Sequence, residues 1–152
     1  MTINEIVKIL LVTFRNGGKA LICGNGGSAA EAQHFSSELM CGMYHKKGRG
    51  FPAIALTTDT SIITAWSNEI NYDDIFSRQV EVLGDTGDVL IVLSTSGKST
   101  NCLNAARTAL AKGLKVVDLP RVGETTARIQ ENHLKMIHKI CAKIEKETNE
   151  GN

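Results

Sequence analysis

Four short and almost uninterrupted apolar segments limit the fold of this chain more than any other feature of its sequence. Segments with helical periodicity separate them along the chain. The four lie at Lys19–Cys23, Pro52–Leu56, Asp88–Ser94 and Leu114–Asp118. Strands that are apolar on both faces and alternate with helices are typical of a parallel sheet covered on each side. The sequence therefore predicts an α/β fold, a three-layer sandwich with a central parallel sheet flanked by helices.

The remaining segments repeat apolar residues at intervals of three and four, the pattern of amphipathic helices. The first covers about residues 3–16 and ends at the glycine pair Gly17-Gly18, a common helix stop. Further helices are expected at about 28–43, 60–67, 73–83, 98–112 and 126–147. No repeat, low-complexity tract or linker divides the sequence, so its 152 residues are expected to form one domain.

Charge and composition exclude several classes of partner. Lys and Arg number 17 and Asp and Glu 16, a net charge of +1, so no bulk field attracts nucleic acid or an anionic membrane. The apolar run Ile9–Phe14 is too short to cross a bilayer, and no small-residue cleavage site follows it. The four cysteines are widely spaced, which suits buried thiols in a reducing compartment. We therefore expect a cytoplasmic protein with neither nucleic acid nor membrane as a partner.

Two loops follow predicted strands at the edge where parallel α/β sheets bind ligands. In Gly24-Asn-Gly-Gly-Ser28 the glycines can bring the backbone close to an anion at a helix N-terminus. The alternative is a tight turn in which Ser28 only caps the helix. The loop Ser94-Thr-Ser-Gly-Lys-Ser99 has four hydroxyl groups around a glycine, whereas capping needs one. This second loop favours binding of an anion or a sugar.

Polar side chains on two predicted helices are candidates for chemistry. His34 and Glu38 are four residues apart, so they share a helix face and form either a metal or proton-transfer pair or a simple surface contact. The last helix carries Gln130, His133 and His138 among apolar residues. Polar groups on a helix packed against a sheet are destabilising unless they are paired or functional. Each histidine remains open between an ordinary structural position and a functional one.

Five segments in one order make the chain resemble a known family. They are Gly24-Asn-Gly-Gly-Ser28, His34-Phe-Ser-Ser-Glu38-Leu39, Asn71-Tyr-Asp-Asp-Ile-Phe-Ser-Arg78, Ser94-Thr-Ser-Gly-Lys-Ser99, and Arg128-Ile-Gln-Glu-Asn-His133 with the later His138. Together they resemble the phosphoheptose isomerases, which belong to the sugar isomerase (SIS) domain class. The resemblance covers nearly the whole chain and implies a single flavodoxin-like or Rossmann-like SIS domain over residues 1–152.

The resemblance also implies an activity. This is the aldose–ketose isomerisation of sedoheptulose 7-phosphate to D-glycero-D-manno-heptose 7-phosphate through an enediol, which supplies heptose for the lipopolysaccharide core. It further implies zinc binding and a homo-oligomer, expected as a tetramer with active sites at subunit interfaces. An enediol mechanism needs a base, an acid and stabilisation of oxyanion charge. A carboxylate, an imidazole and a metal can supply these.

Residue by residue, the resemblance assigns three sets of site residues. Glu38 and His138 match the acid–base pair. The metal ligands match His34, Glu38, Gln130 and His138. The substrate-binding residues match Asn25, Ser28, Ser94, Thr95, Ser96, Ser99 and Gln130. Gln130 and His138 are eight residues apart, about 12 Å along a helix, so we rely less on Gln130 as a metal ligand than on Glu38 and His138 as catalytic groups.

The chain departs from the family pattern in two places. Its helix ahead of Ile3 is shorter than in the family. Between Leu119 and Thr126 too few residues remain for the family's fifth strand, because a parallel crossover takes a dozen or more. Either the chain is a shortened variant, or residues near 119–125 are missing from the sequence, and we favour the second.

Two other functions are alternatives to the isomerase activity. Some SIS-domain relatives are not isomerases and bind a replication initiator protein as tetramers. The presence of His34, Glu38, Gln130 and His138 favours the enzyme over such a binding module. A sugar-phosphate-sensing regulator is the other alternative, but the 152 residues contain no segment with the pattern of a DNA-binding motif.

Overall fold

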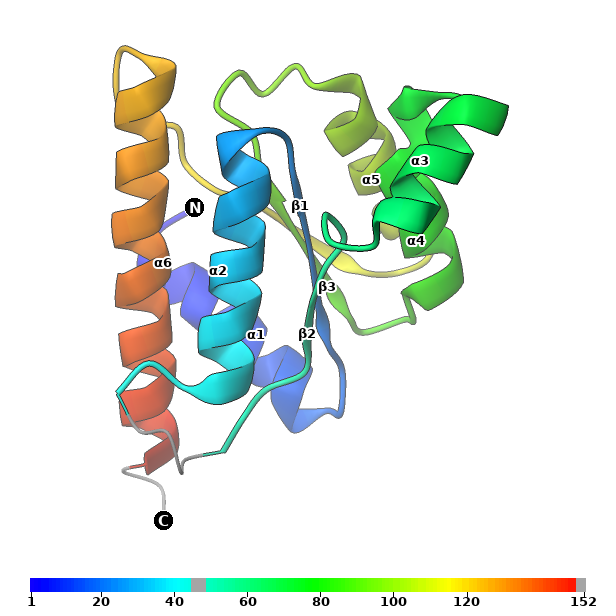
Figure 1. Cartoon of the computed structure of the whole chain (residues 1–152). Coiled ribbons are helices and arrows are strands. Elements are labelled where there is room, and N and C mark those ends of the chain that lie inside the picture. The colour runs from blue at the N-terminus through cyan, green and yellow to red at the C-terminus, as the bar shows by residue number, and fades with distance from the viewer. Residues whose placement is uncertain (45–48, 150–152) are drawn as a thin grey trace.

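A parallel four-stranded sheet runs through the centre of the computed structural model, which describes residues 1–44 and 49–149 (Figure 1). The strands lie in the order β2–β1–β3–β4, and each neighbouring pair is parallel. In β1, Ala20 is paired with Ala53 on one side and with Val89 on the other. The strands are β1 (Ala20–Gly24), β2 (Ala53–Ala55), β3 (Val89–Leu93) and β4 (Lys115–Asp118). All four carboxyl ends therefore open at the same edge of the sheet.

Helices cover both faces of this sheet (Figure 1). On one face lie α1 (Ile3–Arg15), α2 (Gly27–Cys41) and α6 (Thr126–Asn149). On the other side lie α3 (Thr60–Glu69), the short 3-10 turn η1 (Tyr72–Asp74), α4 (Ile75–Leu83) and α5 (Thr100–Ala111). The predicted fold class is confirmed, and the predicted helices and strands begin and end within about two residues of the observed bounds.

Each face of the sheet has its own apolar cluster. Ala20 and Ile22 pack with Phe35 and Ile137 on the α2 and α6 side. Their neighbour Leu21 packs with Phe76 on the α4 and α5 side. Because alternate residues of a strand point to opposite faces, a strand buried on both faces must be apolar at every position. This explains why the segments that predicted the sheet are continuous apolar runs.

The chain from β4 to α6 is a short connection, residues 119–125. The Leu119 amide still donates to the carbonyl of Val92, and the Asn132 side chain holds the carbonyl of Val122. Among residues 1–44 and 49–149 the sheet has four strands and no fifth. This agrees with the expectation that a further crossover does not fit between Leu119 and Thr126.

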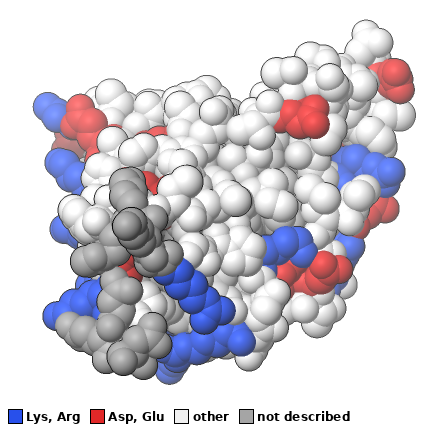
Figure 2. Space-filling view, turned by 60° about the horizontal axis from the view of Figure 1, so that its bottom comes forward, with Lys and Arg blue, Asp and Glu red and all other residues white. Residues whose placement is uncertain are grey.

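The distribution of charged residues on the surface and the character of the helices agree with the near-neutral net charge and the short apolar runs of the sequence. Figure 2 shows Lys and Arg beside Asp and Glu around a face whose centre carries few charged side chains. No helix of the described part of the chain has both the length and the apolar character needed to span a bilayer. Any recognition of an anion therefore depends on local groups rather than on the net field of the protein.

Candidate functional site

The loop between β1 and α2 is a tight glycine turn. A Cβ atom on Gly24 would lie 2.8 Å from the carbonyl oxygen of Leu93, so β1 and β3 leave no room for a side chain there. Gly26 is the N-cap of α2 with a φ of 58°, a conformation that favours glycine. No side chain caps α2. The interpretation of Ser28 as a mere N-cap is therefore wrong, and its buried hydroxyl lies in the first turn of the helix.

The loop Ser94–Ser99 is shaped by two of its own hydroxyl groups. Ser94 Oγ accepts a hydrogen bond from the Gly97 amide at 3.0 Å, and Ser96 Oγ accepts one from the Lys98 amide at 3.1 Å. A hydroxyl that accepts in this way keeps its own proton for donation. Ser99 is the N-cap of α5, but its side chain makes no capping bond. These hydroxyls therefore remain suited to a phosphate or sugar oxygen.

Arg121 lies over this loop. The sequence did not predict this position of Arg121. Its Nε donates to the Ser94 carbonyl at 2.8 Å, and its Nη2 is paired with the Asp118 carboxylate. A Cβ on Gly97 would lie 2.7 Å from the Arg121 guanidinium carbon, so the two are in close contact. A cavity of about 140 Å³ beside them is lined in part by Ser94, Ser99 and Arg121. The loop therefore has a cation next to its hydroxyls.

Asn25 connects the two loops through a network of amides. Its Nδ2 donates to Asn101 Oδ1, and Asn101 Nδ2 donates back to Asn25 Oδ1, both at 2.9 Å. The Tyr72 hydroxyl also donates to Asn25 Oδ1 at 2.9 Å. The sequence predicted a sugar contact for Asn25 and missed Asn101 and Tyr72. Of these two, Asn101 could have been predicted more easily, because it lies in the first helical turn after the hydroxyl-rich loop.

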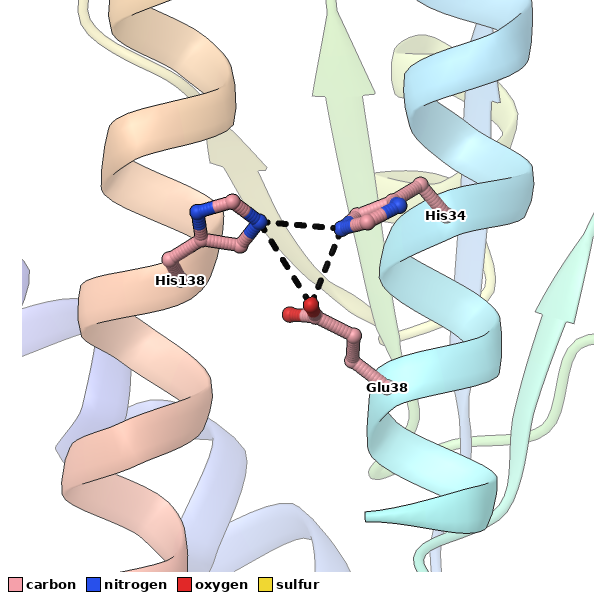
Figure 3. A group of neighbouring side chains, drawn as sticks. All are labelled: His34, Glu38 and His138. Atoms are coloured by element: carbon pink, nitrogen blue, oxygen red, sulfur yellow. Dashed lines mark hydrogen bonds and ion pairs between the residues drawn. The ribbon is translucent and has the colours of Figure 1, made fainter. Parts of the chain in front are cut away.

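His34, Glu38 and His138 converge between α2 and α6 (Figure 3). His34 Nε2 lies 2.9 Å from Glu38 Oε1 and 3.1 Å from His138 Nε2. His138 Nε2 lies 3.5 Å from Glu38 Oε1. The i,i+4 spacing puts His34 and Glu38 on one face of α2, and His138 reaches them from α6. The fold therefore brings together these three predicted residues, although His34 and His138 are 104 positions apart in the sequence.

The cluster is buried at its base and open above. The Glu38 side chain is 12% exposed, whereas those of His34 and His138 are 41% and 39% exposed. Glu38 Oε2 is buried without a hydrogen-bond partner among the described residues. Beneath it lies Cys141, whose pKa is raised by burial and by the nearby Glu38 carboxylate. A substrate or an ion can therefore reach the imidazole side of the cluster.

The spacing of the three groups suits a divalent metal ion. Their ligand atoms lie within 4.8 Å of one another. Zinc bonds of about 2.0–2.1 Å in a tetrahedron put neighbouring ligand atoms about 3.3 Å apart, close to the observed separations. Two imidazoles and a carboxylate are also a donor set that zinc accepts in catalytic sites, with one position left open. The donor set and the spacing of the three residues therefore fit a metal ion such as zinc.

Gln130 lies apart from these contacts, at the N-terminal end of α2. A Cβ on Gly27 would come within 2.5 Å of Gln130 Nε2. On α6, Gln130 is eight residues, or about 12 Å, before His138. Gln130 thus lies beside the glycine turn, and its role in substrate binding stays a prediction. Its role as a metal ligand stays a prediction.

Comparison with known proteins defines the family. The family model for the SIS domain matches residues 1–119. Phosphoheptose isomerase from Aliarcobacter butzleri (strain RM4018) is 47% identical over 92% of this chain and 82% of its own length. The same-named protein from Helicobacter pylori (strain P12) is 45% identical over 95% of this chain and 83% of its own length. The chain belongs to the phosphoheptose isomerase family.

Solved structures of phosphoheptose isomerases share this fold. The protein from Neisseria gonorrhoeae matches with a TM-score of 0.87 and 40% identity, and the protein from Francisella tularensis with 0.90 and 36%. Each match covers 95% of this chain and 85% of the other. The resemblance read from five sequence segments is therefore confirmed. The comparisons favour the isomerase over the alternative of a non-catalytic module that binds a replication initiator.

Proposed function

We propose that this member of the phosphoheptose isomerase family converts sedoheptulose 7-phosphate to D-glycero-D-manno-heptose 7-phosphate. The observation that carries the proposal is the meeting of Glu38 and His138, on different helices, with Oε1 and Nε2 3.5 Å apart. A carboxylate and an imidazole at this separation can serve the carbon and the oxygen atoms of one enediol.

The proton transfers need two groups with distinct tasks. Glu38 takes the proton from C1 of the ketose, which yields the enediol, and returns a proton to C2. His138 donates a proton to the carbonyl oxygen at C2 and accepts the proton from the hydroxyl at C1. The position of Glu38 at the base of the cluster, with Oε1 facing both imidazoles, supports its role as the base.

Zinc, held by His34, Glu38 and His138 with Gln130 as the further predicted ligand, would stabilise negative charge on the reacting oxygens when bound. The distances of 2.9, 3.1 and 3.5 Å among the first three residues support this assignment. Glu38 and His138 appear in both the acid–base and the metal set, so a chelator experiment is needed to separate the two roles.

The two loops are proposed to hold the other end of the substrate. Hydroxyl groups of Ser94, Thr95, Ser96 and Ser99 bind the phosphate, together with Ser28. Asn25 contacts the sugar. Hydroxyls and backbone amides can hold a phosphate at a helix N-terminus without a large net charge, which agrees with the net charge of +1.

We also propose that the protein is a cytoplasmic homotetramer with its sites at subunit interfaces. The large exposed apolar side chains include Val12 on α1 and Leu110 on α5, and α3 has no buried residue. A neighbouring subunit would cover apolar side chains of this kind. Light scattering coupled to gel filtration tests this proposal, and a monomer at micromolar concentration would contradict it.

Residues 1–152 are further proposed to form one SIS domain that lacks an internal segment near 119–125. The alignment with the Helicobacter pylori relative extends over 160 residues, more than the 152 of this chain, so the relative has residues without a counterpart here. The seven-residue connection 119–125 is where such a segment would fit between β4 and α6.

An assay with sedoheptulose 7-phosphate beside other ketose phosphates and the phosphate-free ketoheptose tests the proposed function. We expect turnover of sedoheptulose 7-phosphate, slower turnover of the other ketose phosphates, and poor binding of the phosphate-free sugar. Glu131→Gln, a change at an exposed position of α6 whose side chain pairs with Arg128, serves as the control and is expected to retain activity. Equal binding with and without the phosphate would contradict the role of the two loops.

A further inference from the structure

Glu31 and His133 form a second polar contact between α2 and α6. Glu31 Oε2 and His133 Nδ1 lie 3.9 Å apart. His133 is fully buried, and Glu31 is only 9% exposed. The sequence suggested no role for Glu31 and left His133 open between a core position and a functional one.

Neither group has a full set of hydrogen bonds. Glu31 Oε2 and both ring nitrogens of His133 are buried without a partner of normal geometry in the described part of the chain. The backbone of Leu119 and Pro120 also lies near the His133 ring. Buried polar groups are destabilising when they are unpaired, and an apolar pair would pack here without that penalty. The presence of two such groups at one point of a helix interface therefore calls for a role other than packing.

The contact lies between two other polar contacts of α2 with α6, and we call these three together the α2–α6 seam. The seam consists of Gly27 with Gln130, Glu31 with His133, and His34 and Glu38 with His138. In Figure 1 the two helices run side by side in the same direction, and contacts between them agree with this view. The three contacts thus follow one another in the same order along α2 and along α6.

Glu31 is linked in turn to the substrate loop. Burial raises the pKa of Glu31, and the Ser28 hydroxyl, one helical turn earlier, partly offsets this rise. His133 is five residues before His138 on the same rigid helix. The Glu31–His133 contact therefore lies between a residue proposed to bind the substrate and the residues proposed to carry out the chemistry.

We propose that Glu31 and His133 are positioning residues that set the register of α6 on α2. Through this contact, Glu31 orients the Ser28 hydroxyl. His133 fixes the position of α6 along its axis, and with it the place where His138 meets His34 and Glu38. A slide of one residue along a helix axis moves a side chain by about 1.5 Å, enough to separate groups that are now 3.1–3.5 Å apart. The turnover readout rests on the proposed function, whereas the metal-binding readout does not.

The test is a double-mutant cycle with Glu31→Ala, His133→Ala and the double variant. Ser36→Ala is the matched control, because Ser36 is a buried polar residue of α2 whose hydroxyl donates to the Ala53 carbonyl of the sheet rather than to α6. Glu31→Gln keeps the size and the hydrogen-bonding capacity of Glu31. Turnover of sedoheptulose 7-phosphate, zinc affinity by competition with a chelating dye, and thermal unfolding are measured for each folded variant.

We expect each alanine variant to lower kcat/KM and zinc affinity about tenfold, as loss of a supporting contact does at metal sites. The double variant is no worse than either single one, because both changes break the same contact. Glu31→Gln stays within about threefold of the parent, and Ser36→Ala lowers the unfolding temperature alone. Alanine variants that lose only thermal stability, like Ser36→Ala, would overturn the proposal, and so would losses that multiply in the double variant.

The zinc measurement separates this inference from the proposed function. If the parent chain does not turn over sedoheptulose 7-phosphate but the zinc affinities follow the expected pattern, the positioning role is supported and the proposed function fails. If the parent turns over the substrate and the variants match Ser36→Ala in kcat/KM and zinc affinity, the proposed function stands and the positioning role fails. A parent chain with neither turnover nor zinc binding would overturn both.

Discussion

The helix pairs on the two faces of the sheet differ in what joins them. On one face, α4 and α5 meet through apolar side chains such as Phe76, Val80 and Ala105, all buried. On the other, the α2–α6 seam joins its two helices through glutamine, glutamate and histidine side chains. Both pairs nevertheless rest on the sheet through apolar residues, among them Phe35 and Ile137 on the α2 and α6 side.

This difference between the two helix pairs shows where the protein places apolar side chains and where it keeps reactive polar ones. Burial of apolar area stabilises the protein by about 25 cal/mol per Å², whereas an unpaired buried polar group costs about 1–3 kcal/mol. The α4–α5 pair follows the first rule, and its buried Gln79 is hydrogen-bonded to the carbonyls of Leu56 and Ile75. The α2–α6 seam retains polar groups that weaken it, and these are the groups that can transfer protons and bind a metal. Both faces thus contribute apolar burial, but the cluster of His34, Glu38 and His138 lies on one face alone among the described residues.

The largest effect is expected from His138→Asn, which tests the reactive face. Removal of a general acid or base slows a reaction by about 10²–10⁴-fold. Because the imidazole is 39% exposed, its loss changes packing little, and the unfolding temperature should stay within a few degrees of the parent. Steady-state kinetics and a thermal melt give both values. A variant with normal kcat and a strongly lowered melting temperature would reverse the comparison.

Phe76→Ala tests the opposite face. The side chain is almost fully buried against the sheet, so the change should destabilise the protein by about 3–5 kcal/mol through lost burial and a cavity. Chemical denaturation measures this loss. For the fraction that remains folded, kcat is expected to be close to that of the parent, because Phe76 packs on the opposite face of the sheet from the cluster of His34, Glu38 and His138. A large fall in kcat at full folding would show that the two faces are not independent.

Ser96→Ala separates binding from chemistry within the site. The hydroxyl accepts from the Lys98 amide and is proposed to donate to the phosphate. We expect KM for sedoheptulose 7-phosphate to rise about tenfold with kcat little changed, the pattern of a lost binding contact. Inhibition by inorganic phosphate should weaken by a similar factor. A fall in kcat at constant KM would place Ser96 with the reacting atoms instead.

A smaller effect is expected from the pH dependence of stability. Burial lowers the pKa of His133 from its ordinary 6.5, so the unfolded chain binds a proton there before the folded one does. The contribution of His133 to the free energy of unfolding is fully present above about pH 6.5. It is lost as the pH falls toward the pKa of His133 in the folded protein, by at most about 1.4 kcal/mol per pH unit. The groups that face the ring are Glu31, Asp118 and Arg121, with the backbone of Leu119 and Pro120.

Denaturation of the parent and of His133→Leu between pH 7.5 and 5.5 measures this dependence. Glu31 works in the opposite sense, because its raised pKa favours the folded state at low pH and this contribution fades as pH rises through that pKa. The leucine variant should therefore show a flatter profile over the acidic part of the range. Parallel profiles would show that His133 is protonated equally in the folded and unfolded chains.

The sequence predicted the fold closely because its signals are local. Continuous apolar runs indicate strands buried on both faces, and the period of three to four residues indicates helices, wherever these segments end up in space. The Ser28 hydroxyl was harder to interpret, since a serine after a glycine turn is a common cap. The observed N-cap, Gly26, depends on the backbone angle adopted beside β3, which the local pattern does not contain.

The site could be predicted only in part, and for a physical reason. The pairing of His34 with Glu38 follows from helical spacing, but their meeting with His138 came from the family resemblance. The partners Asn101, Tyr72 and Glu31 were missed because their contacts depend on how helices are placed against one another. Such contacts join residues far apart in sequence, and neither composition nor periodicity encodes the register between two helices.

The central claim is that the carboxylate of Glu38 carries the carbon-bound proton. Incubation of sedoheptulose 7-phosphate with the enzyme in deuterated water, followed by NMR, measures how fast deuterium enters the sugar carbon. We predict steady incorporation with the parent chain and none above background with Glu38→Gln, although the variant still binds the substrate. Incorporation at the parent's rate in Glu38→Gln would contradict the account.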